Sequence, residues 1–298
     1  MSDTHPDRRL AWLAWVTICL VWGTTYLAIR VALETIPVFL VAGLRWMTAG
    51  LLLTALTLAR RRPLPPARHW GGLVLLGFLM NVLGNGFVVW AEQYVASGLT
   101  AVIIASVPFW SVGFEAMLPG GDRLRGGTLL ALGVGFTGIV VLVWPEMSAG
   151  GQAGATMLGG VVAIQIACAG WALGTSYARR HPSATDPVAA SAIQMLASGT
   201  MLLTVATLTG EWPALHFTTR SLGALVYLTL AGSVVAYTAY LYTVAHLPLT
   251  TVSLYAYINP LIAVLLGAAL LNEPLSPRIA VASVLVLGGM ALLRRVQS

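Results

Sequence analysis

The sequence has few charged residues, no lysine and only two cysteines. Charged residues make up 9% of the 298 residues, whereas hydrophobic residues make up 58% and the mean hydropathy is +0.84. A soluble domain of this length cannot bury so much apolar surface, so the composition excludes that class and indicates a polytopic helical membrane protein. Cys19 and Cys168 fall inside apolar runs, which gives no sign of a disulfide framework.

The 16 basic residues are all arginines, and they gather in short clusters between apolar runs. The net charge of +6 therefore indicates how the chain is oriented in the membrane, and a nucleic-acid partner is not expected. No histidine has an acidic or cysteine neighbour at metal-ligand spacing, and no GxSxG motif occurs. We accordingly predict no catalytic site, no metal site and no cofactor, and an intramembrane enzyme is the least favoured class.

Ten apolar runs are long enough to cross a membrane as helices. The loops on one side hold 12 arginines and those on the other hold 3, so the positive-inside rule predicts that both termini are cytoplasmic. The first run is longer than a signal-peptide core and no cleavage pattern follows it, so it is taken as a retained span. The expected spans are 10–30, 37–59, 70–90, 96–118, 125–144, 156–178, 187–208, 220–242, 249–271 and 276–293.

The second half of the sequence repeats the first. Pro108 and Pro260 each interrupt an apolar run, at an offset of 260 − 108 = 152 residues. Each half holds five spans, and an odd number makes the second half enter the membrane from the opposite side. We therefore predict an all-α protein of ten transmembrane helices in two inverted five-helix repeats, 1–148 and 149–298, as in many secondary transporters. Further matches are Gly23–Tyr26 with Gly174–Tyr177, Arg45–Gly50 with Gln194–Gly199, and Gly138 with Gly289.

Several motifs carry a resemblance to a known family. They are the WGTTY stretch that begins at Trp22, the LRW stretch around Arg45, the two proline helices, and the acidic-Leu turns at Asp122–Leu124 and Glu273–Leu275. At these residues, and over nearly the whole chain, the sequence resembles the EamA-type members of the drug/metabolite transporter superfamily. The resemblance implies a bacterial inner-membrane exporter of amino acids or related metabolites, aromatic amino acids, threonine and homoserine among them, that works by alternating access.

Polar residues within the spans are candidates for substrate contacts. Asn81 and Asn85 recur at helical spacing on one face of the third span, together with Glu92. That face must meet protein or water, and the two amides suit a zwitterionic or hydroxyl-bearing solute. The alternative is that they form interhelical hydrogen bonds. Gln165 of the sixth span is a further candidate for substrate binding.

The two proline helices are candidates for lining the transport pathway. A proline within a span leaves a carbonyl without its hydrogen bond, which is tolerated where protein or a wet cavity satisfies it. Pro108 in the fourth span and Tyr255 and Asn259 in the ninth are therefore expected to line a central cavity. A packing kink is the alternative.

Aromatic residues away from the span ends provide the apolar part of the expected site. Trp22, Trp171 and Tyr237 lie too deep for an interfacial belt. Tyr26 lies one turn after Trp22, and Tyr255 shares a face of the ninth span with Asn259. Together they would form a mostly apolar pocket for a medium-sized organic solute. Core packing is the alternative.

Few ionisable residues fall inside the spans. Arg45 has three possible roles: it binds a substrate carboxylate, pairs with Glu34 or Glu92, or extends to the membrane surface. Glu115 is expected to pair with Arg123 or Arg125. Proton antiport would rest on Glu92 or Glu115, and a carrier driven by the solute gradient is equally compatible.

The fifth and tenth spans are rich in small residues, which favours close helix packing in a static flank, with a dimer interface as the alternative. The sequence thus predicts a monomeric exporter of a small-molecule substrate, embedded in the bilayer of a bacterial inner membrane. An exporter of drugs or other organic metabolites, and a channel-like facilitator, are the alternatives. Trans-stimulated uptake would separate a carrier from a channel.

Overall fold

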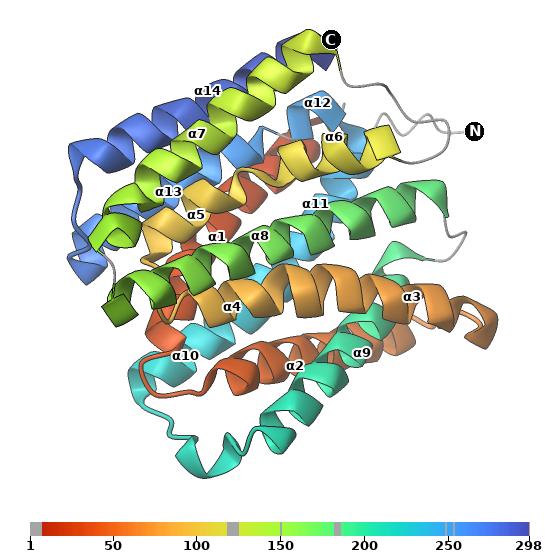
Figure 1. Ribbon diagram of the computed structural model, residues 1–298. Coiled ribbons are helices and arrows are strands. Elements are labelled where there is room, and N and C mark those ends of the chain that lie inside the picture. Colours follow the sequence, from red (N-terminus) through yellow and green to blue (C-terminus); the bar gives the residue numbers. More distant parts are fainter. Residues whose placement is uncertain are drawn as a thin grey trace.

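The computed structural model describes residues 8–117, 125–149, 151–181, 186–247, 249–252 and 254–297, and these ranges form helices without a strand. Nine of the predicted spans appear there as helices long and apolar enough to cross a membrane. The ninth predicted span differs, because it divides into α12 (Leu249–Val252) and α13 (Tyr255–Leu271). The spans lie side by side in one bundle (Figure 1).

The other elements follow the predicted spans closely. In chain order they are α1 (Arg8–Ala32), α2 (Val38–Ala59), η1 (Ala67–His69), α3 (Trp70–Leu76), η2 (Gly77–Gly86), α4 (Phe87–Ala91), α5 (Ser97–Ile104), α6 (Val107–Met117), α7 (Gly126–Ala149), α8 (Gly151–Arg180), α9 (Pro187–Leu208), η3 (Trp212–Ala214), α10 (Thr219–Tyr227), η4 (Leu228–Val235), α11 (Ala236–His246) and α14 (Pro277–Gln297).

Both proline-containing spans are broken, but neither break lies at the proline itself. In the fourth span α5 ends at Ile104 and α6 begins at Val107, so Pro108 occupies the first turn of α6. A proline is tolerated there because the missing N–H has no partner within the helix anyway. Pro260 instead lies within α13, after the break that precedes Tyr255.

The third and eighth spans each contain a π-helical segment, which the sequence analysis did not predict. η2 begins at Gly77 and η4 at Leu228, an offset of 228 − 77 = 151 residues, so the two segments are at equivalent places in the repeat. Regular π-helix is rare and often marks functional sites. The segments therefore draw attention to the centre of the third and eighth spans.

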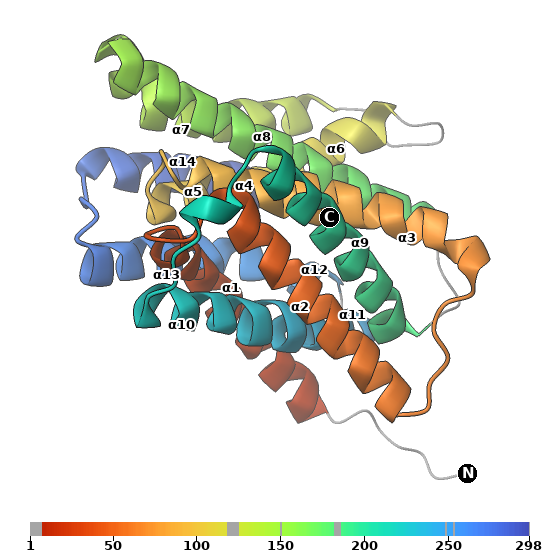
Figure 2. The ribbon, with the colours of Figure 1, turned by 90° about the horizontal axis from the view of Figure 1, so that it is seen from below.

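Helix pairing follows the repeat. The equivalent helices α2 and α9 pack against each other, as do α7 and α14 (Figures 1 and 2). α1 contacts α13 and the eighth span, and its counterpart α8 contacts the fourth span and the third. Each contact thus recurs with the halves exchanged, as the predicted inverted repeat requires.

Paired glycines allow these helices to approach closely. A Cβ on Gly50 would lie 2.7 Å from the Leu196 nitrogen, and one on Gly199 would lie 2.5 Å from the Met47 nitrogen. Gly289 meets the backbone of α7 in the same way, with a distance of 2.7 Å from its Cβ position to the Gly135 nitrogen. Gly135 and Gly289 of the fifth and tenth spans are therefore used inside the bundle, whereas a Cβ on Gly133 or Gly288 would meet no atom within 4 Å among the described residues.

The two ends of the bundle differ in charge. One end, called the acidic end below, carries Glu34, Glu92, Glu211 and Glu273 in the turns between spans. The opposite end, called the arginine end, carries the helix ends that bear Arg62, Arg180 and Arg295, among others. Which end faces the cytoplasm stays a prediction from the positive-inside rule.

Candidate functional site

Five aromatic rings from four spans meet inside the bundle. The Trp22 ring centroid lies 5.2 Å from that of Tyr255, 5.3 Å from that of Tyr240 and 6.4 Å from that of Trp171. Tyr237 adjoins Tyr240 at 6.3 Å. These distances and the tilted or edge-to-face geometries are those of stabilising aromatic pairs. The five residues, called the aromatic cluster below, are Trp22, Trp171, Tyr237, Tyr240 and Tyr255.

The aromatic cluster lies in the middle of the spans. Trp22 is ten residues from the last residue of α1, which corresponds to about 15 Å along a helix. An interfacial belt does not explain rings at this depth. The side chains of the aromatic cluster are half-buried. Trp12, Trp70, Trp144 and Trp212, in contrast, are exposed near the span ends, as the belt interpretation predicts.

Polar contacts hold the rings of the cluster in place. The Trp22 indole N–H donates to the Gly232 carbonyl at 3.1 Å. The Tyr237 hydroxyl has the side chains of Ser191 and Gln194 as polar neighbours. Tyr26, one turn from Trp22, packs against the apolar core formed around α2 and α9.

Arg45 is buried beside the aromatic cluster. It is 3% exposed, its Nε donates to Ser233 Oγ at 2.8 Å, and its Nη1 donates to Asn85 Oδ1 at 3.2 Å. Asn85 belongs to η2 and Ser233 to η4, so both π-helical segments supply a ligand to one guanidinium group. The guanidinium therefore does not extend to the membrane surface, which rules out the third role proposed for it.

Arg45 has no carboxylate directly opposite it. Glu34 pairs with Arg220 at 3.1 Å, and none of the described carboxylates lies within 4.0 Å of the Arg45 guanidinium. Glu92 attracts it from a longer range. A buried cation with only neutral hydrogen-bond partners is costly, and it is a favourable place for an incoming anion.

The guanidinium and the aromatic cluster form one continuous region. A Cβ on Gly232, whose carbonyl accepts from Trp22, would lie 3.4 Å from Arg45 Nη2. Tyr237 follows Ser233 by one helical turn. The region thus places aromatic rings beside one positive group, a combination that suits an organic solute that carries a carboxylate.

The two amides of the third span point to different helices. Asn81 is 1% exposed and its Nδ2 donates to Ser198 Oγ of α9 at 3.1 Å. This is the interhelical hydrogen bond considered as the alternative for both amides. Only Asn85 joins the Arg45 site.

Gln165 and Pro108 belong to the break in the fourth span. The Gln165 Oε1 accepts from Trp110 Nε1 at 2.8 Å, and its Nε2 donates to Ser106 Oγ at 3.4 Å. Ser106 lies between α5 and α6, so Gln165 of α8 fixes the broken segment against the second half. The side-chain hydrogen bonds of Gln165 are thus made at this break, and Pro108 lies next to it in the first turn of α6.

The predicted face of the ninth span packs on α1. Asn259, oriented by its hydrogen-bond partners, donates to the carbonyls of Cys19 at 3.0 Å and Tyr255 at 3.1 Å. The bond to Tyr255 reaches a carbonyl one turn earlier in α13 itself. The bond to Cys19 fixes α13 on α1 so that Tyr255 meets Trp22. Asn259 is 6% exposed, so it acts on the aromatic cluster by holding α13 against α1.

Among the described residues Glu115 pairs with Arg180 and not with Arg125, whereas the other expected partner, Arg123, cannot be compared. The Glu115 carboxylate pairs with Arg180 at 2.9 Å and accepts from Ser176 Oγ at 2.6 Å, both from α8. Arg123 and the Asp122 turn lie outside the described residues. α8 packs against α6, which brings Arg180 to Glu115.

Two carboxylates of the second half bind helix N-termini of the first half at the acidic end. Glu211 accepts from the Phe39 and Leu40 amides of α2 at 3.3 and 3.0 Å. Glu273 accepts from the Ser97 amide and hydroxyl at 2.8 Å each and from the Gly98 amide at 3.0 Å. A carboxylate at a helix N-terminus satisfies free N–H groups and the helix dipole.

Sequence reasoning missed these contacts because capping across 170 or more residues leaves no local pattern. The position of Glu273 has a local cause in Asn272, which ends α13 in the left-handed conformation with φ 54°. Asparagine adopts this conformation more readily than most residues, and it turns the chain back toward α5.

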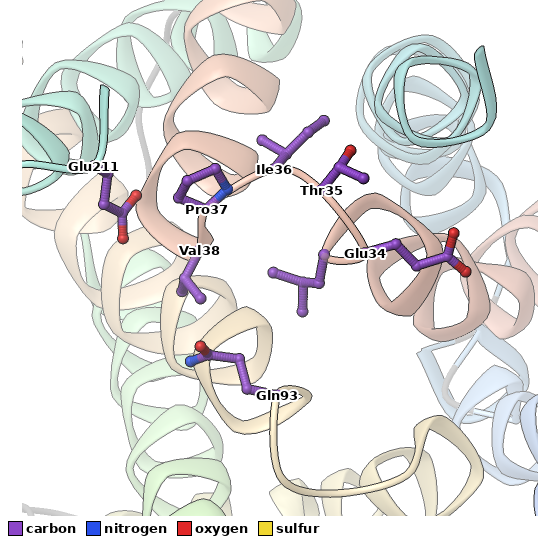
Figure 3. Close-up of a pocket in the computed structure, with 8 residues that line it drawn as sticks. Glu34, Thr35, Ile36, Pro37, Val38, Gln93 and Glu211 are labelled. Atoms are coloured by element: carbon purple, nitrogen blue, oxygen red, sulfur yellow. The ribbon is translucent and has the colours of Figure 1, made fainter. Parts of the chain in front are cut away.

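Two pockets lie at the acidic end. The first, of about 310 Å³, is formed mainly by the turn between α1 and α2, with Gln93 and Glu211 opposite (Figure 3). In Figure 3 the Glu34 side chain points away from the other labelled side chains. The second, of about 600 Å³, is lined by Tyr94, Glu273 and Arg278, among others.

Comparison with known proteins identifies relatives over nearly the whole chain. The model of the EamA-like transporter family matches residues 9–144 and 158–295. The uncharacterized inner membrane transporter YedA of Escherichia coli K12 is 36% identical over 86% of this chain and 81% of its own length. The uncharacterized protein PA1977 of Pseudomonas aeruginosa is 31% identical over 97% of this chain and 95% of its own. A solved crystal structure, 22% identical, matches the fold with a TM-score of 0.67 over 97% of this chain and 99% of that one.

Proposed function

The chain belongs to the EamA-like transporter family, and from this premise we propose that it is an inner-membrane secondary transporter that exports amino acids, aromatic ones included, or related small carboxylate-bearing metabolites. Membrane location and a transport role follow from the family and from the apolar helices. The substrate class and the direction of transport are the proposal.

The observation that supports this substrate class is the Arg45 guanidinium beside the aromatic cluster. A substrate carboxylate would bind the guanidinium in a bidentate or single contact, while the apolar part of the substrate rests on Trp22 and Tyr255. The rings offer enough apolar surface to pack against an aromatic or branched substrate side chain. Threonine and homoserine would use Asn85 or a tyrosine hydroxyl for their own hydroxyl group.

The repeat supports transport by alternating access. In this proposal the halves 1–148 and 149–298 rock about the aromatic cluster, and the paired glycine-rich α7 and α14 stay fixed as a flank of a monomer. The caps made by Glu273 and the contact of Glu34 with Arg220 join the halves at the acidic end. The conformation is thus one in which that end is held together.

A transporter of other organic compounds is the second candidate, because half-buried aromatic rings also suit drug-like solutes. Arg45 favours anionic over cationic compounds among these. A channel-like facilitator would use the same spans without alternating closure.

The test is uptake of labelled amino acids into proteoliposomes that hold the purified protein, with and without unlabelled amino acid inside. Saturable uptake that the internal amino acid stimulates would support an amino-acid carrier. Uptake without trans-stimulation would indicate a channel. No uptake of any amino acid by folded protein, with transport of another organic anion, would reject the amino-acid class.

A further inference from the structure

Glu92 is a buried carboxyl group without a hydrogen-bond partner. It follows α4 directly, in the turn between the third and fourth spans, and its side chain is 0% exposed. Neither Oε1 nor Oε2 accepts a hydrogen bond from any part of the chain that the structure describes. An ionised carboxylate in such surroundings loses its hydration without replacement, whereas the neutral acid loses far less.

Charged and titratable groups surround Glu92 on several elements. They are Tyr26 and Arg30 of α1, Arg45 of α2, and Glu273 in the turn before α14. Arg30 donates to the backbone carbonyl of Glu92 and not to its carboxyl group. Burial raises the pKa of Glu92 well above its usual range; Arg30 opposes the rise, Glu273 adds to it and Arg45 opposes it.

The position of Glu92 links its charge to the closure of the acidic end. Glu273 binds the N-terminus of α5, and an ionised Glu92 would place a second negative charge near that contact. The residues that follow Glu92 line the two pockets at this end: Gln93 the first and Tyr94 the second. Glu92 is therefore one residue from accessible space while remaining buried itself.

We propose that Glu92 is a proton-binding site, occupied while the acidic end is closed and emptied into water when that end opens. The inference rests on the proposed function only in requiring that this end opens during transport. Closure then takes up one proton per molecule: water donates it to Glu92, and opening returns it. A lower pH on the acidic side favours the closed conformation.

Hydrogen exchange of the Ser97 and Gly98 amides measures the closure without a substrate. If opening releases one proton, their exchange rate, corrected for the intrinsic rate, rises about tenfold per pH unit while Glu92 is protonated in the closed form. Glu92→Gln, neutral and of the same shape, should show no such slope. Glu34→Gln, which alters an exposed carboxylate at the same end, should keep the wild-type slope. A flat wild-type profile, or an unchanged slope in Glu92→Gln, overturns the proposal.

Infrared difference spectroscopy provides a second measurement. At neutral pH the wild type should show the C=O band of a protonated carboxyl group, and Glu92→Gln should lose that band while Glu34→Gln retains it. Should Glu92→Gln fail to fold, Glu92→Met serves as the neutral variant. Persistence of the band in the folded variant rejects Glu92 as the site.

The outcomes separate this inference from the proposed function. Absence of amino-acid transport with both Glu92 signals present would reject only the substrate class. Amino-acid transport by a protein that lacks both signals would reject only the proton site.

Discussion

The two halves of the chain share their helix order and contribute different chemistry to the centre. The first half supplies Arg45, Asn85 and Glu92, whereas the second supplies four of the five rings of the aromatic cluster. The position equivalent to Arg45 in the repeat is Gln194, which is 5% exposed and contacts Met80 Sδ at 3.9 Å. The first half thus supplies most of the polar groups of the candidate site and the second half most of its aromatic rings, so both halves are needed to form the site.

The difference between the halves teaches that symmetry of fold does not require symmetry of the site. Both π-helical segments are kept in the repeat, yet Asn85 in one and Ser233 in the other converge on the same guanidinium. One arginine can therefore serve both halves, because the pseudo-twofold arrangement brings the centres of the third and eighth spans together at Arg45. The substitutions below test this division of roles.

Replacing Arg45 by glutamine makes position 45 like its counterpart Gln194 and should have the largest effect. Loss of a charge-assisted contact of about 1.5–3 kcal/mol would lower the apparent affinity for a carboxylate-bearing substrate roughly 10- to 100-fold. Concentration dependence of proteoliposome uptake measures this. Arg60→Gln, which alters an exposed arginine at the arginine end, is the control and should change uptake little. Equal loss in both variants would contradict the role of Arg45.

Replacing Trp22 by alanine removes the first half's only ring from the aromatic cluster. Each aromatic pair contributes about 0.5–1.5 kcal/mol, so we expect about a tenfold weaker affinity for substrates with large apolar side chains. Competition by unlabelled amino acids of different size measures the change. Trp12→Ala, at an exposed site near the end of α1, should leave the ranking of competitors unchanged. The same shift in the Trp12 variant would show that the effect is not specific to the cluster.

Asn81 and Asn85 separate packing from binding within the third span. Asn85→Ala removes a neutral partner of Arg45 and should weaken apparent affinity about fivefold, from about 1 kcal/mol. Asn81→Ala removes the hydrogen bond to Ser198 and should lower thermal stability by a similar free energy without changing affinity. Uptake kinetics and thermal unfolding of both variants distinguish the two. The assignment fails if the two variants behave alike in both assays.

The smallest effect is expected at the N-terminus of α9, which lies at the arginine end and is capped differently from the N-terminus of the equivalent helix α2 at the acidic end. α2 is capped by Glu211 of the other half, whereas α9 is capped by its own Asp186 through the Val188 and Ala189 amides. Asp186→Ala should lower stability by about 0.5–1 kcal/mol at neutral pH, as measured by thermal unfolding in detergent.

The pH dependence of this cap follows from Asp186. Burial opposes its ionisation, but hydrogen bonds from Arg62, Ala189 and Val188 outweigh burial and hold the pKa of Asp186 below its usual value. The folded-state pKa is thus lower than the unfolded one, so the stabilisation is present above the unfolded pKa and is lost as pH falls through the folded pKa. Asp186→Asn should remove this part of the acid dependence. An unchanged acid dependence would contradict it.

Much of the fold followed from sequence because each span is a local property. Apolar runs bounded by Arg, Pro or Gly placed nine helices close to their observed limits, and the paired glycines Gly50 and Gly199 marked a real crossing. The site followed only in part. The depth of Trp22, Trp171 and Tyr237 identified a cluster, and Tyr240 could have been added because it lies three residues after Tyr237.

The remaining features depend on contacts between distant segments. Asn81 and Asn85 have the same chemistry and neighbouring positions, and only the packing of α9 and α2 gives them different roles. Glu115 pairs with an arginine of the other half because α8 lies beside α6. The π-helical segments leave no recognisable pattern of their own in the sequence.

The sequence by itself determined an all-helical membrane protein of many spans with an internal repeat, because hydropathy, span length and duplicated motifs are local properties of the chain. The tertiary structure alone decided which polar residues share a site. Arg45 meets Ser233 across 188 residues, and the Glu92 carboxyl has no hydrogen-bond partner among the described residues, because helix packing sets distances that no local pattern encodes.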